Sequence, residues 1–305
     1  MHLTWQPNSD LSAFHAAWCC LSLPDRTQHC DSCLHSSAEA LQAEIAPLLA
    51  TFSAPAGQPR ISPVPRFWSS LFALSTQHPS SRELAELLIR NLAGNSQVEQ
   101  AARLEGSLLD CKQAFRQTFP NFEKEAAFRL GPLQSLWEAQ GPGLLRLIGQ
   151  QTTPELVLDS ARVFVVQPIL AGGGYAHLRG RAIHLEGVLT NEHPIFPEVL
   201  RLAWLLSQLD YERPHFSEQL NQLRLREVAG LAMIPAVLSA GRELDICNCD
   251  TPTTAAAIAA WLPDILAPSS VQQSEHDTQS KLATLLMNWW ETHSATRRDW
   301  PTSLT

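Results

Sequence analysis

Lysine is scarce in this chain, and basic residues are not clustered. Only three of the 22 basic residues are lysines, and 30 acidic residues bring the formal net charge to −8. The longest basic run is the pair Arg297 and Arg298. Nucleic-acid binding draws most of its affinity from clustered cations on phosphates, so the sequence predicts no nucleic-acid partner.

Long apolar runs are missing too. The longest nearly uncharged stretches, 11–23 and 228–240, are shorter than the roughly 20 residues that cross a bilayer. The opening segment 1–7 lacks the basic flank and cleavage site of a secretory signal, and seven cysteines, an odd number, do not fit a complete disulfide framework. We therefore expect a cytoplasmic protein without a membrane segment.

The common catalytic and phosphate-binding motifs are also absent. No Gly-x-Ser-x-Gly elbow occurs. The glycine triplet at 172–174 is followed neither by Lys-Ser or Lys-Thr nor by a helix signal, so it predicts a turn into a strand rather than a phosphate loop.

The first half of the chain has the pattern of a helical lobe, residues 1–150. Capping boxes, in which a serine caps the first turn and a glutamate three residues later reaches back, stand at Ser36, Ser80 and Ser96. The apolar spacing that follows predicts helices at 40–52, 84–92, 98–119, 122–130 and 133–139. Four prolines in 53–66 predict an extended connection.

The second half, residues 151–305, has the pattern of a mixed lobe. β-branched and aromatic residues at 162–166, followed by 176–179 and 182–187, predict a sheet of about three strands within residues 161–187. Helices are expected to cover it at 197–209, 216–228, 231–240, 253–261 and 274–294. The fold class predicted for the whole chain is α+β, mainly helical.

Two pairs of cysteines suggest a zinc site. Cys30 and Cys33 have a spacing that lets two thiolates bind one tetrahedral zinc, and Cys247 with Cys249 could complete a four-sulfur site. The alternative is that these cysteines stay reduced and fill small buried spaces.

Histidines and glutamates gather between residues 184 and 193. His184 and Glu186 fall on one face of the expected strand, and Glu192 and His193 follow. The two histidines could bind a metal while Glu186 or Glu192 acts as a catalytic base, which predicts a metal-dependent hydrolase. The alternative is a solvated polar face.

The order of a strand at 181–187 and a helix at 197–209 resembles the edge strand and active helix of zincin-type metallopeptidases. That family carries His-Glu-x-x-His on the helix, with two metal ligands and a general base. The matching positions here hold Trp204, Leu205 and Gln208. The resemblance, which covers about fifty residues, implies an inactive relative; the alternative is an ordinary amphipathic helix.

Tryptophans are concentrated near the C-terminus, where Trp289, Trp290 and Trp300 lie. Tryptophan is enriched at binding hot spots, so Trp289 and Trp290 are candidates for contacts with a protein partner or a second copy. The alternative is that they fill the core. The function predicted from the sequence is that of a non-catalytic interaction or scaffold protein.

Overall fold

The computed structural model divides the chain into two compact units, and each is described by itself. One unit contains Gln6–Phe128 and Val165–Ala171, and the other contains Met1–Trp5, Arg129–Phe164 and Gly172–Thr305. The structure describes residues 1–23, 31–50, 63–77, 80–93, 98–156, 158–170, 172–189, 193–195, 197–211, 225–262, 275–296, 300 and 304.

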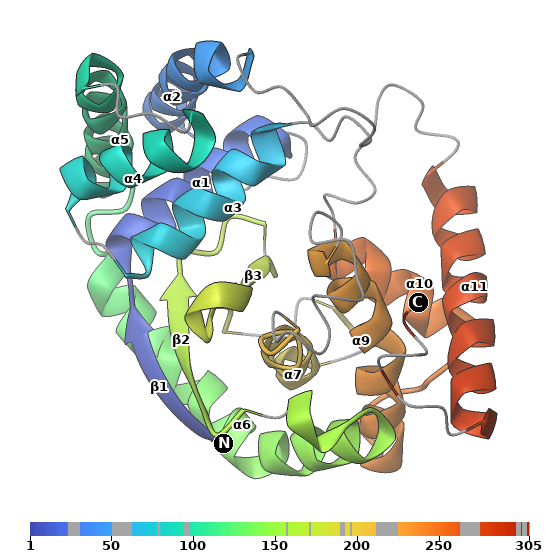
Figure 1. Cartoon of the computed structure of the whole chain (residues 1–305). Helices are drawn as coiled ribbons and strands as arrows, with labels where there is room; N and C mark the ends of the chain where they lie inside the picture. The colour runs from blue at the N-terminus through green and yellow to red at the C-terminus, as the bar shows by residue number, and fades with distance from the viewer. Residues whose placement is uncertain are drawn as a thin grey trace. The chain divides into compact units, whose positions relative to one another are not determined.

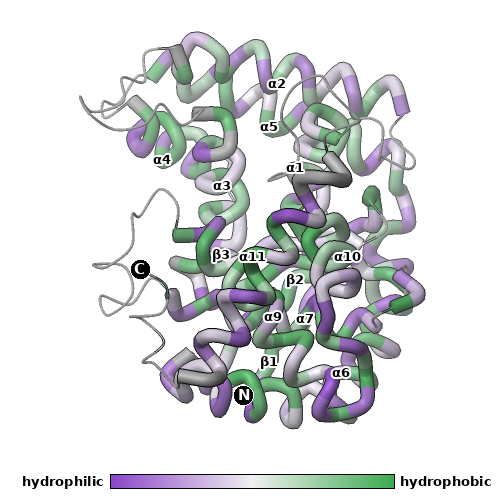
Figure 2. The backbone as a smooth tube through the Cα atoms, turned by 90° about the vertical axis from the view of Figure 1, so that its right-hand side faces the viewer, coloured by the Kyte–Doolittle hydropathy of each residue, from purple (hydrophilic) through white to green (hydrophobic). Residues whose placement is uncertain are grey.

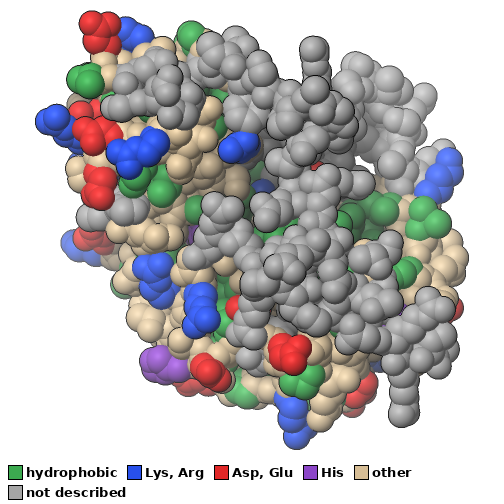
Figure 3. Space-filling model, in the orientation of Figure 1, with side chains coloured by type: hydrophobic (Ala, Val, Ile, Leu, Met, Phe, Trp, Pro, Cys, Tyr) green, Lys and Arg blue, Asp and Glu red, His purple; other side chains and the backbone are tan. Residues whose placement is uncertain are grey.

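The predicted fold class, α+β and mainly helical, is confirmed. The described residues form ten α-helices and one four-stranded sheet (Figure 1). None of the described helices combines the length and the apolar character needed to cross a membrane. Acidic and basic side chains are interspersed over the coloured part of the surface in Figure 3.

The unit that contains Gln6–Phe128 is a helical bundle, which we call the bundle unit. Its helix α5 packs against three other helices, and α3 packs against α1 and α4. Hydrophobic and hydrophilic residues alternate along α2 and α5 (Figure 2), as expected for helices with one buried face. The helices are α1 (Ser9–Ser22), α2 (Ser32–Ala50), α3 (Pro63–Ser75), α4 (Ser81–Ala93) and α5 (Val98–Thr118).

The helix starts in this unit correct one prediction and support another. Ser36, expected to cap a helix, lies inside α2, which starts four residues earlier because the Asp31 carboxylate accepts the Leu34 N–H at 2.8 Å. Ser80 does cap α4, accepting the Glu83 N–H at 3.4 Å. Ser96 lies outside the described residues, as does most of the expected connection 53–66, whose end instead starts α3.

The helices expected at 122–130 and 133–139 are one long helix, α6 (Phe122–Gln151), with Pro132 and Pro142 inside it. Each internal proline removes a helical hydrogen bond. A buried stripe of Leu133, Trp137 and Ile148 offsets this cost by packing into the core. A short 3₁₀ turn, η2 (Pro154–Leu156), follows.

The other unit is built on the sheet, and we call it the sheet unit. Its strands β1 (His2–Pro7), β2 (Ser160–Val166), β3 (Gly174–His177) and β4 (Ala182–Glu186) lie in the order β1-β2-β4-β3. Strands β3 and β4 are antiparallel, with Tyr175 opposite His184, and they are joined by a 3₁₀ turn, η3 (Leu178–Gly180). The sequence predicted the last three strands but not β1.

Among its described residues, the sheet unit also contains most of α6, from Arg129 on, and four further helices: α7 (Glu198–Leu206), α9 (Leu225–Glu243), α10 (Thr251–Trp261) and α11 (Glu275–Thr296). Helix α7 is buried throughout and packs on β3, β4 and α9, while α10 and α11 pack together and against α9. The expected helix at 231–240 is part of the longer α9. The expected helix at 216–228 lies mostly outside the described residues.

Candidate functional site

Arg201, on α7, ties this helix to the sheet. Its guanidinium forms a salt bridge with Glu198 and donates hydrogen bonds to the carbonyl oxygens of Gly173 and of Glu186, the latter at 3.1 Å. The arginine is only 2% exposed. A buried arginine is tolerated only when its donors are paired, so this network fixes α7 against β4 and the glycine loop before β3.

The Glu186 side chain is fully buried at the end of β4. Its Oε2 atom accepts the N–H groups of Gly172 at 2.8 Å and Gly173 at 3.0 Å. Gly172 has a φ of 142°, which side chains rarely permit, so glycine allows the loop to present two N–H groups to one oxygen. The glycine triplet thus holds an internal carboxylate, as backbone nests hold anions.

Two histidines form a buried pair on the β3–β4 hairpin. His177 Nε2 lies 3.0 Å from His184 Nδ1, and Tyr175 stacks on His184. The Arg226 guanidinium lies 3.2 Å from the centre of the Tyr175 ring. Burial, together with the positive charges of Arg226 and Arg162, lowers the pKa of His177 to about 3. The imidazole of His177 is therefore neutral at neutral pH.

The three α7 and post-α7 positions that match the zincin motif serve the core. Trp204 stacks on Trp261 and donates its indole N–H to the Gly230 carbonyl at 2.8 Å. A Cβ atom added to Gly174 would lie only 2.8 Å from the Leu205 side chain. Glycine at this position therefore permits the close approach of β3 and α7. Gln208 donates to the Trp204 carbonyl at 2.9 Å.

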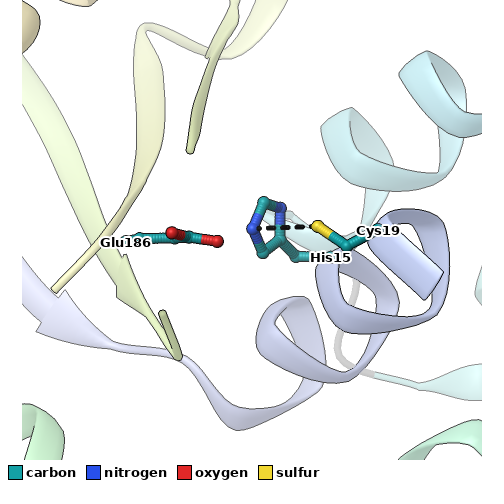
Figure 4. A group of neighbouring side chains, drawn as sticks. All are labelled: His15, Cys19 and Glu186. Atoms are coloured by element: carbon teal, nitrogen blue, oxygen red, sulfur yellow. Dashed lines mark hydrogen bonds between the residues drawn. The ribbon is translucent and has the colours of Figure 1, made fainter. Parts of the chain in front are cut away.

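The bundle unit contains a histidine–cysteine pair that the sequence analysis did not identify. His15 and Cys19 lie one turn apart on α1, with Nε2 and Sγ separated by 3.5 Å (Figure 4). Both are buried. Their spacing of four residues is visible in the sequence, but it becomes informative only once a helix is assigned to this segment.

The cysteines predicted to bind zinc lie in different parts of the chain. Cys30 is outside the described residues, and Cys33 is an exposed free thiol 3.4 Å from Gln117 Oε1. Cys247 and Cys249 are half-buried free thiols whose Sγ atoms face the Leu238 and Pro235 carbonyls of α9. Burial raises the pKa of Cys247 to about 12, and that of Cys249 also rises.

The predicted histidine and glutamate cluster is only partly described. Glu192 lies outside the described residues. His193 is half-buried, and its Nδ1 accepts the Ile195 N–H at 3.3 Å; burial lowers its pKa. Within the described part of the chain, His184, Glu186 and His193 do not bring three ligand atoms within 4.8 Å of one another.

No family model, curated protein or solved structure matches this chain.

The C-terminal tryptophans lie in the core of the sheet unit. Trp290 and Trp300 are buried, and Trp289 is half-buried against the same core. Their ring centres and that of His293 lie between 5.0 and 6.3 Å from one another. These rings pack against one another, as expected if the tryptophans fill the core.

The bundle unit has an open pocket of about 530 Å³ at the start of α1. Asp10 in its wall pairs with Lys112 at 2.8 Å and with Arg116 at 3.5 Å. The charge of Asp10 is therefore balanced by two cations, of which Arg116 also lines the pocket. The pocket is lined by Pro7, Asn8, Ser9, Asp10, Arg116, Phe122 and Glu123.

Proposed function

We propose that this chain is a non-catalytic protein that binds a protein partner or a second copy of itself. The observation that supports this most strongly is that Arg201 and Glu186 form structural contacts inside the protein. Their charged groups are buried and hydrogen-bonded to the backbone and to Glu198. Groups committed in this way hold the segment from β4 to α7 together and are poorly placed to take part in turnover.

The side chains of α7 support the same proposal. A zincin-like helix needs two metal ligands and a general base on one face. Here Trp204 and Gln208 each donate to a backbone carbonyl, and Leu205 packs against Gly174. An inactive relative of zincin-type peptidases, retaining strand and helix for stability, is consistent with this arrangement.

The connection from β4 to α7 offers a contact surface for a partner. Leu189 is 52% exposed and Ile195 is 43% exposed, and both belong to this one connection. Single exposed aliphatic side chains are ordinary, but two on one short connection can join in burying apolar area against a partner. We propose that they contact an apolar surface of another protein molecule.

The absence of catalysis is tested with purified full-length protein, its Glu186→Gln variant and a panel of peptide and ester substrates. We expect no turnover above the buffer rate from either protein. Hydrolysis by the wild type that disappears in the Glu186→Gln variant, together with bound metal, would refute the proposal. It would establish the alternative, a metal-dependent hydrolase that uses His184, Glu186, Glu192 and His193.

Binding is tested with a Leu189→Ser, Ile195→Ser double variant. Sedimentation velocity measures self-association, and cross-linking in extracts of the source organism, followed by mass spectrometry, measures contacts with other proteins. We expect the wild type to show one of these contacts and the variant to lose it. Leu285→Ser, which removes an aliphatic side chain that is 66% exposed on α11, is the control. Equal behaviour of the double variant and the wild type would contradict this role for the connection.

A further inference from the structure

A half-buried arginine of α9 lies against the β3–β4 hairpin. The Arg226 guanidinium is 3.2 Å from the centre of the Tyr175 ring, and within the described part of the chain it forms no hydrogen bond or salt bridge. A guanidinium carries five N–H donors in its own plane, so a ring stacked on its face leaves these donors at the edge. Arg226 can therefore bind an acceptor without leaving Tyr175.

A buried nitrogen atom without a hydrogen bond lies close to this arginine. The His177 ring is 5.3 Å from the Tyr175 ring, centre to centre, and the side chain is only 1% exposed. Its Nε2 atom pairs with His184, whereas its Nδ1 atom has no hydrogen-bond partner among the described residues. Such an atom is rare in a native protein and often marks a place where a water molecule, an ion or a ligand binds.

The charged groups that act on His177 are both positive in the part of the chain that the structure describes. They are the guanidinium groups of Arg226 and Arg162. Glu186 lies on the face of β4 that carries His184, but its carboxylate is held by the N–H groups of the glycine loop before β3. A cluster of partly buried positive charges is stabilised when an opposite charge pairs with it. The cluster therefore favours a bound anion.

We propose that Arg226 and His177 bind a small oxyanion, which is the carboxylate or phosphate group of a small molecule. The edge of the guanidinium donates two parallel hydrogen bonds to two oxygens, as arginine does with both groups. His177 donates a third from Nδ1, in the tautomer in which His184 Nδ1 donates to His177 Nε2. The site lies in the sheet unit alone, and it does not depend on the contact surface proposed at Leu189 and Ile195.

The first test is isothermal titration calorimetry of the full-length wild type with sodium phosphate, sodium acetate and sodium chloride at constant ionic strength. We expect phosphate or acetate to bind at one site per chain and chloride not to bind. Tighter binding of phosphate would assign the ligand to phosphate compounds, and tighter binding of acetate would assign it to carboxylates. No binding of either oxyanion at millimolar concentration, or equal binding of chloride, would overturn the proposal.

The second test uses variants of Arg226, with urea unfolding to show that each is folded. Arg226→Met keeps a long side chain against Tyr175 but loses the charge-assisted hydrogen bonds, so affinity should fall about tenfold or more. Arg226→Lys keeps the charge without the two parallel donors and should have an intermediate affinity. Arg242→Met is the matched control, because Arg242 is an exposed arginine of the same helix.

The position of the site is tested by comparing these affinities. We expect the control variant to bind as the wild type does and His177→Phe, which keeps a ring but lacks the nitrogen donor, to bind more weakly. Unchanged affinity in Arg226→Met, or an equal loss in Arg242→Met, would overturn the proposal. The titration of the wild type decides whether an oxyanion binds at all, even where a variant does not fold.

Discussion

The buried His177 makes a prediction about stability in acid. In the folded chain the imidazole is buried in the hairpin and hydrogen-bonded to His184. The positive charges of Arg226 and Arg162 act on it. Protonation would add a positive charge with no acidic side chain acting on it among the described residues. Replacing His177 with glutamine removes the titrating group and keeps a side chain that can bond to His184. The stability of this variant should therefore depend less on pH.

The size of the effect follows from the two pKa values. The pKa of His177 is about 3 in the folded chain, and that of an unfolded histidine is about 6.5. Between these values the unfolded chain binds one more proton than the folded chain, so stability falls as pH falls, by about 1.4 kcal/mol per pH unit. Between pH 7 and pH 5 the wild type should lose about 2 kcal/mol that His177→Gln does not lose.

The assay is urea unfolding of wild type and variant at half-unit steps from pH 7 to pH 5, followed by tryptophan fluorescence. Other groups also titrate in this range, so the quantity that tests the reasoning is the difference between the two slopes. The variant is less stable at pH 7, because the histidine pair is lost. Its free energy of unfolding should nevertheless fall less steeply as pH falls, by the equivalent of about one bound proton. Parallel curves would show that His177 takes up its proton in the folded state, which would refute its enclosure by the hairpin.

Three substitutions test the packing of the sheet unit by urea unfolding. Arg201→Met leaves the carboxylate of Glu198 buried without its partner, and a loss of about 3–5 kcal/mol is expected; a loss below about 1 kcal/mol would mean that water replaces the guanidinium. Gly131→Ala places a methyl group in open space on α6 and should add about 1 kcal/mol. Gly141→Ala on the same helix would bring Cβ within 2.3 Å of the Trp137 ring, so a net loss of about 1–3 kcal/mol is expected; a gain equal to that of Gly131→Ala would show that the ring is free to move.

Local signals in the sequence predicted much of the secondary structure. The apolar spacing of 98–119 and 253–261 recovered α5 and α10 to within two residues, because α5 contains no proline and Pro252 of α10 stands in the first turn, where a helix tolerates it. The same rules divided α6 at its prolines. Burial of Leu133 and Trp137 outweighs the lost hydrogen bonds there, and this energy depends on neighbours distant in sequence. Strand β1 was missed because it is half polar and largely exposed.

Contacts between the candidate site residues were harder to predict from the sequence than the helices and strands. His177 and His184 both lay in predicted strands, yet their contact depends on the register that sets Tyr175 opposite His184. A shift of one residue would send one histidine to the other face. His15 and Cys19, by contrast, need no register, since one turn of helix is enough to bring them together. The contact between His15 and Cys19 therefore depends on α1 alone, whereas the contact between His177 and His184 depends on how two strands pair.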